Sequence, residues 1–98
     1  LRNAYTLKIQ NRTQGATEFT LTFEGPVGAV LTAQGVEPAA NGRIVLPVRA
    51  DAVGEFRVFL TVPPGTRLPQ STPVTFRLLD PTGRAVAREA SVFMAPRP

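Results

Sequence analysis

Residues 55–65, EFRVFLTVPPG, carry the clearest structural signal in this chain of 98 residues. From Phe56 to Val62 every second residue is apolar, and apart from Phe59 the residues between them are charged or polar. A period of two is that of a β-strand with one buried face, since successive side chains point to opposite faces. The Pro-Pro-Gly run at residues 63–65 ends the pattern, because proline lacks the main-chain N–H that a strand ladder needs. The segment therefore predicts a half-buried strand.

Six other segments show the same alternation or a shorter apolar run, at residues 5–10, 18–24, 29–31 (the weakest), 44–48, 74–78 and 84–94. Turn-forming residues separate them. Asn41 and Gly42 are the strongest hairpin signal, because both tolerate a positive φ. Asp80-Pro81-Thr82-Gly83 fits a type I turn, and residues 51–54 are expected to form another turn.

No segment shows the apolar spacing of three and four residues that is typical of a helix. The sequence therefore predicts an all-β fold, an antiparallel β-sandwich of about seven strands of the immunoglobulin-like or fibronectin type III-like kind. It has no disulfide, because the chain has no cysteine.

The length allows one small hydrophobic core, so we expect residues 1–98 to form a single domain. The chain begins at Leu1 rather than Met and enters a strand pattern at once, and we interpret it as a domain excised from a longer chain. No segment approaches the roughly 20 consecutive apolar residues of a membrane-spanning helix. We therefore expect no direct membrane insertion by this fragment.

The chain contains neither cysteine nor histidine. Thiolate nucleophiles, cysteine-ligated metals, Ser-His-Asp triads and histidine metal sites all need those side chains. We therefore expect no enzyme activity, and no catalytic, cofactor-binding or metal-binding residues in this fragment.

The formal net charge is +4, from 11 Lys and Arg against 7 Asp and Glu. The arginines are scattered singly along the chain, and aromatic residues do not interleave with them as on a nucleic-acid platform. We therefore expect no nucleic-acid partner. We expect the arginines to lie on the surface, where they could contact an acidic protein partner.

Phe59, Leu79 and Val45 fall on the polar phase of their strands. Exposed apolar residues can mark a docking surface, although single surface hydrophobes are also normal. We predict a partner-binding sheet face around Arg57, Phe59, Arg77 and Leu79, with addition of a strand at a sheet edge as another route.

Local irregularities give further expectations. Pro47 is expected at a sheet edge or at a position pointing away from a neighbouring strand, and a β-bulge near Arg88 and Glu89 would reconcile the two phases of the last strand. Tyr5, the only tyrosine, is expected to face the core. Asn-Arg-Thr at residues 11–13 fits the glycosylation sequon, but we interpret it as a strand end leading into a turn.

The opening segment, LRNAYTLKIQNRT at residues 1–13, resembles the start of the C-terminal immunoglobulin-like domain of the FixG/CcoG family, the cytochrome c oxidase accessory proteins. Further agreement lies in Phe-Thr-Leu at residues 19–21 before Glu24 and Gly25, in Val-Pro-Pro-Gly at residues 62–65, and in Val-Ala-Arg-Glu at residues 86–89 with Phe93 and Pro96 beyond it. The resemblance spans nearly the whole chain.

This resemblance implies a non-catalytic interaction or structural domain of a membrane-bound iron–sulfur protein. The parent would bind two [4Fe–4S] clusters in an upstream membrane portion and take part in maturation of cbb3-type cytochrome c oxidase, by copper reduction or delivery. The domain would be periplasmic, at an inner membrane, and its partner an oxidase subunit, a copper chaperone or its own membrane domain. The alternative is a generic bacterial sandwich module for cell-surface, carbohydrate or protein binding.

Overall fold

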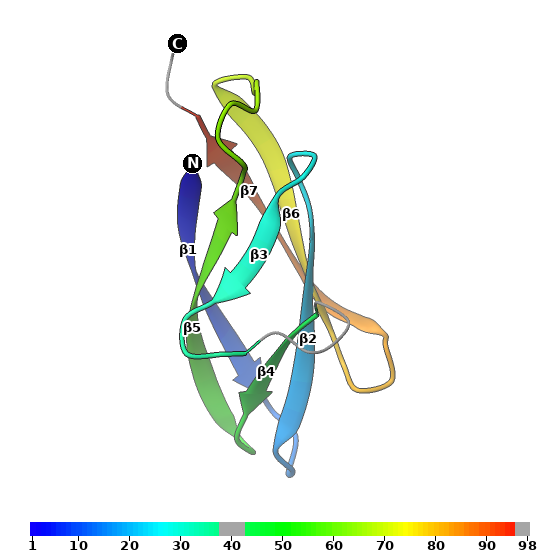
Figure 1. Cartoon of the computed structure of the whole chain (residues 1–98). Helices are drawn as coiled ribbons and strands as arrows, with labels where there is room; N and C mark the ends of the chain where they lie inside the picture. Colours follow the sequence, from blue (N-terminus) through cyan, green and yellow to red (C-terminus); the bar gives the residue numbers. More distant parts are fainter. Residues whose placement is uncertain (38–42, 96–98) are drawn as a thin grey trace.

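The computed structural model describes residues 1–37 and 43–95, and in this part of the chain every regular element is a β-strand (Figure 1). No helix there could span a membrane. The strands are β1 (Arg2–Asn11), β2 (Thr17–Glu24), β3 (Val30–Ala33), β4 (Ile44–Val48), β5 (Ala52–Thr61), β6 (Ser71–Leu79) and β7 (Ala85–Met94).

The strands form two antiparallel sheets, one in the order β1-β5-β3 and the other in the order β4-β2-β6-β7. Up to β6, successive strands alternate between the two sheets, so the apolar faces of both meet in one core. The apolar side chains from which solvent is fully or almost fully excluded are Ile44, Leu46, Val58, Leu60, Val62, Val74 and Phe93. The structure confirms the predicted seven-stranded sandwich.

The alternation in the sequence identifies the buried face of most strands correctly. In β5 the predicted inward residues Val58 and Leu60 are buried, and Phe56 is half-buried against the core. In β6 the inward set is Val74, Phe76 and Leu78. The hairpin signal at Asn41 and Gly42 lies outside the described residues.

Gly54 lies inside β5 rather than in a turn, so the turn predicted over residues 51–54 is too long. The chain reverses at Asp51, whose φ of 49° is in the left-handed region, and β5 begins at the next residue. Gly54 is explained by packing, because a Cβ built there would lie 2.7 Å from Cε2 of Phe56 and 3.0 Å from Cγ2 of Val48.

The bulge of β7 lies at Val86, two residues before the predicted position at Arg88 and Glu89. Leu78 pairs with Ala87 and Leu79 pairs with Ala85, which leaves Val86 as the extra residue. Residues 85–90 are all exposed, so they carry no burial signal from which the position could be predicted. Phe93 is the one buried residue of β7.

Pro47 lies in β4, the outer strand of its sheet, which confirms the expected edge position. Tyr5 packs against the core with its ring centroid 5.0 Å from that of Phe76, in an edge-to-face arrangement. The expectation of an inward Tyr5 is thus confirmed for the ring. Its hydroxyl reaches the sandwich margin and donates a hydrogen bond to the main-chain carbonyl of Val92 at 2.9 Å.

Asn11 is the only buried polar residue in the described part of the chain. Its Nδ2 lies 3.1 Å from the carbonyl oxygens of Gly15, Val48 and Arg49, and its Oδ1 accepts hydrogen bonds from the N–H and hydroxyl of Thr13. The hydrogen-bonding capacity of the Asn11 amide nitrogen is therefore satisfied within the fold. Residues 11–13 close a strand, as interpreted from the sequence.

Candidate interaction surfaces

The four residues predicted to share a binding face lie on two different sheets. Arg57 and Phe59 belong to β5, where they alternate with the buried Val58 and Leu60. Their side chains therefore point outward from the three-stranded sheet.

Arg77 and Leu79 belong to β6 in the other sheet, where they alternate with the buried Phe76 and Leu78. The two sheets present their outer faces to opposite sides of a sandwich. The structure thus corrects the expectation of a single face, and a binding role for either pair stays a prediction.

The outer face of the three-stranded sheet brings two arginines onto Phe59. Cζ of Arg2 lies 4.5 Å from the centroid of the Phe59 ring, and Cζ of Arg57 lies 5.9 Å from it. The cross-strand partners of Phe59 are Ala4 and Thr32, whose small side chains leave the half-buried ring accessible. We call Arg2, Arg57 and Phe59 the Phe59 surface.

Arg2 is a member of this surface that sequence reasoning missed. It is 57 positions away from Phe59 in the sequence, and only the β1–β5 register, in which Arg2 pairs with Thr61, brings it there. A cation held over an aromatic face at an exposed site is stabilised by about 0.5–1 kcal/mol. Two guanidinium groups therefore lie at one apolar ring. This arrangement suits a partner surface in which carboxylates surround an apolar side chain.

On the outer face of the four-stranded sheet, the charge of Arg77 is balanced by a carboxylate, unlike the arginine charges of the Phe59 surface, which form no ion pair among the described residues. Nη1 of Arg77 lies 2.8 Å from Oε1 of Glu24, and both side chains are substantially exposed. An ion pair of this kind contributes about 0–1 kcal/mol to stability. Leu79 and Val45 both pair with Thr20 of β2, so the two out-of-phase apolar residues are separated by one polar side chain.

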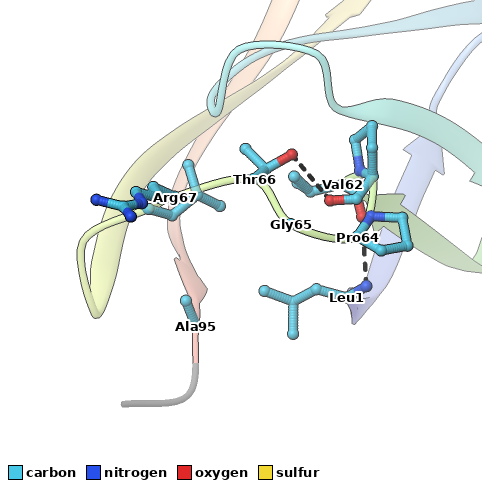
Figure 2. A pocket seen from close by; sticks show the side chains of 9 residues that line it. Leu1, Val62, Pro64, Gly65, Thr66, Arg67 and Ala95 are labelled. Carbon is cyan, nitrogen blue, oxygen red and sulfur yellow. Dashed lines mark hydrogen bonds between the residues drawn. The ribbon is translucent and has the colours of Figure 1, made fainter. Parts of the chain in front are cut away.

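A hollow of about 630 Å³ lies at the end of the sandwich beside Leu1 and Ala95, over the loop of residues 62–68 (Figure 2). The loop is held by hydrogen bonds from the Thr66 hydroxyl to the Pro63 carbonyl, at 2.8 Å, and from the Leu1 amino group to the Val62 carbonyl, at 3.3 Å (Figure 2). Among the described residues that line it, Arg67 has the only charged side chain, and none has a carboxylate, imidazole or thiol. These residues thus offer no side chain for general base catalysis.

Among the described residues, two ionisable side chains have a displaced pKa, and both make hydrogen bonds within the fold. Burial raises the pKa of the Tyr5 phenol. Hydrogen bonds from the Thr82 hydroxyl and from the main-chain N–H groups of Arg84 and Thr82 lower the pKa of Asp80, whose Oδ1 closes the turn between β6 and β7. The hydrogen bond from Gly83 N to Asp80 O, at 2.9 Å, confirms a β-turn there.

Within residues 1–37 and 43–95, no three His, Cys, Asp or Glu side chains gather in a way that could hold a metal ion. An iron–sulfur cluster needs cysteine thiolates, and the chain has none. The residues of this chain therefore do not fit a cluster, and no chemical step can be derived through one.

Comparison with known proteins identifies the relatives of the chain. A family model described as "IG-like fold at C-terminal of FixG, putative oxidoreductase" matches residues 1–96. The crystal structure of a FixG-related protein from Vibrio parahaemolyticus is similar, with a TM-score of 0.76 and 22% sequence identity, over 96% of this chain and 78% of that chain. At this identity the structural likeness shows the fold. No curated protein matches the chain.

Proposed function

The chain belongs to the family of immunoglobulin-like domains at the C-terminus of FixG, and from this premise we propose that it is a non-catalytic protein-interaction domain of a membrane-bound iron–sulfur protein. The parent protein would act in maturation of cbb3-type cytochrome c oxidase, in copper reduction or delivery, with this domain in the periplasm. The two [4Fe–4S] clusters of such a parent would belong to an upstream portion, because this chain has no cysteine.

The observation that carries an interaction role is the Phe59 surface. Arg2 and Arg57 lie over a half-buried aromatic ring, and the small Ala4 and Thr32 beside it leave room for a partner side chain. Aromatic residues and arginines are the types most often found at energetic centres of protein interfaces. The partner is a protein with an acidic surface, and the candidates are an oxidase subunit, a copper chaperone and the membrane portion of the parent.

Charge-reversal variants on each of the two sheets test which candidate face binds the partner. We expect the double variant Arg2→Glu with Arg57→Glu to weaken binding about tenfold or more, because it opposes an acidic partner at two positions. The matched double variant Arg77→Glu with Arg88→Glu makes the same change of net charge on the other sheet and is expected to leave affinity nearly unchanged. Binding is measured by titrating the labelled domain with each of the three purified candidates, after urea unfolding has shown that the variants are folded.

Two results would count against the proposal. If none of the three candidates binds the unmodified domain, the interaction role fails. If the matched variant on the four-stranded sheet weakens binding as much as the double variant of Arg2 and Arg57, the Phe59 surface is not the specific contact.

A further inference from the structure

We propose that the free edge of β7, from Arg88 to Ala90, binds an extended polypeptide segment as an added strand of the four-stranded sheet. This surface is distinct from the Phe59 surface, so the inference stands or fails independently of the proposed function. It rests on three observations. Main-chain groups along the outer edge of β7 are unpaired, a groove lies beside this edge, and the side chain of Asn3 binds the edge as a neighbouring strand would.

Along β7 the main-chain N–H and C=O groups of successive residues point alternately toward β6 and toward the free edge. Ala95 N donates to Gln70 O at 2.9 Å, so from Ala87, after the bulge, to Met94 the main-chain N–H and C=O groups of the odd-numbered residues point toward β6 and those of the even-numbered residues point toward the free edge. Pro73 agrees with this pattern, because it pairs with Val92 at a position where no N–H is needed. Within the described residues, the N–H groups of Arg88 and Ala90 have no hydrogen-bond partner.

The side chain of Asn3 shows what this edge accepts. Its Nδ2 donates to the Met94 carbonyl and its Oδ1 accepts from the Met94 N–H, both at 3.0 Å. A carboxamide bonded in this way occupies the place of a peptide group in a neighbouring strand. The Tyr5 hydroxyl takes the next outward carbonyl, that of Val92. From Ala90 back to Arg88, no side chain of the described residues is hydrogen-bonded to the outward main-chain groups of β7.

A groove follows the uncovered part of the edge. β1 and β7 lie together near Asn3 and Met94 and diverge along their length (Figure 1). Between them are two adjoining hollows of about 460 and 260 Å³, which share Thr6, Leu7, Phe76 and Glu89 in their linings. Leu78 and Ile9 extend the apolar part of the lining, and Lys8 adds another charged side chain beside Glu89. Inward side chains of an added strand would thus meet apolar side chains interrupted by polar and charged ones.

The charges along the edge define the sequence that fits. Arg88 points outward and has no ion-pair partner among the described residues, and its neighbour across the ladder is Arg77. An added strand therefore favours acidic residues at its outward positions. Glu89 lines both hollows, so the inward position opposite it favours a basic residue, with apolar residues on either side.

The probe is the peptide acetyl-Thr-Val-Glu-Lys-Glu-Val-Thr-amide, which has this pattern in either strand direction. Titrated into the ¹⁵N-labelled protein, it is expected to shift the amide signals of Arg88, Ala90 and Val92 and to slow exchange of the Ala90 amide. A peptide of the same composition in the order Val-Val-Glu-Glu-Lys-Thr-Thr serves as the control, because it lacks the alternation.

Ala90→Pro tests the main-chain contact directly. It removes an N–H that faces the free edge and leaves the β6 ladder intact, and we expect it to weaken peptide binding about tenfold, as for one lost hydrogen bond. Ala90→Val keeps the N–H and is expected to bind as before. Should Ala90→Pro fail to fold, Arg88→Glu replaces it and is expected to reduce binding of the acidic probe.

Three results would overturn the inference. These are equal shifts with the two peptides, shifts confined to the Phe59 surface, and concentration-dependent shifts at Ala90 without peptide, which would assign the edge to a second copy of the chain.

Discussion

Asn3 in β1 is joined to Met94 in β7 by two hydrogen bonds of 3.0 Å between its side-chain carboxamide and the main chain of Met94. The two residues are 91 positions apart in the sequence and belong to different sheets. The pair ties the first strand to the last across the margin of the sandwich. It also protects one end of the β7 edge from pairing with another chain.

Replacing Asn3 by alanine is expected to lower the free energy of unfolding by about 1 kcal/mol, because the released main-chain groups are exposed and can bind water. Urea unfolding measures the change. Thr6→Ala on the outer face of β1 is the control and should have little effect. A loss no larger than that of the control would show that the Asn3 bonds do not stabilise the fold.

Asn11→Ala is expected to be more destabilising, by about 2–4 kcal/mol, since it removes the side-chain donor from the buried bond to the Val48 carbonyl and from the partly buried bond to the Arg49 carbonyl. The three carbonyls within 3.1 Å of Nδ2 come from Gly15, Val48 and Arg49, so the turn after β1 and the end of β4 loosen together. The exposed neighbour Gln10, changed to alanine, is the matched control. Equal urea midpoints for the two variants would contradict this prediction.

Phe93→Ala is expected to cost about 3–5 kcal/mol because Phe93 is fully buried. Val92→Ala, one position away on the outer face, is expected to stay within about 0.5 kcal/mol, since Val92 is 45% exposed. Thermal and urea unfolding compare the two variants. Similar losses for both would mean that the phase of β7 differs from that of the structure.

Gly54→Ala is expected to destabilise by roughly 1–2 kcal/mol, because the new Cβ would press on the Phe56 ring and on Val48. Gly15→Ala is the control, since a Cβ there meets nothing within 4 Å. Adding Phe56→Leu to Gly54→Ala should restore part of the lost stability by removing the close contact. No recovery in the double variant would point to a main-chain origin instead.

Asp80 makes stability depend on pH. Its pKa in the folded protein lies below the ordinary 3.8, chiefly through the hydrogen bond from the Thr82 hydroxyl. A lowered folded-state pKa means that the stabilisation is present above the ordinary value and is lost as pH falls through the folded-state value. Asp80→Asn keeps an oxygen acceptor but removes the charge, so it should be less stable than the unmodified protein at pH 7.

The difference between Asp80→Asn and the unmodified protein should shrink as the pH falls below 3.8, when both side chains become neutral. Urea midpoints measured across this range test the sign. A difference that stays constant with pH would exclude the Asp80 charge as its origin.

Much of the fold follows from local pattern. The alternation around Val58 and Leu60 predicts a strand and its buried face, and the turn residues separate seven such strands. The resemblance of residues 1–13 to the FixG C-terminal domain is confirmed by the family match. Local pattern was less reliable at Gly54, where a glycine required by the Phe56 ring resembled a turn signal.

The arrangement of the candidate surfaces could not be predicted in the same way. Phe59 and Leu79 share a polar phase in their strands, yet they lie on different sheets. Arg2, which the sequence analysis did not select, lies over Phe59.

Residue type and spacing over a few positions are enough to predict the strands, most of their buried faces and the lack of cysteine and histidine chemistry. Which strands are neighbours emerges from the folded chain alone, and with it the two arginines on Phe59, the Asn3 contact with Met94 and the open edge of β7. A period of two specifies which face of a strand avoids water, but it is the same for every strand. The choice of sheet and partner depends on contacts between residues far apart in the chain.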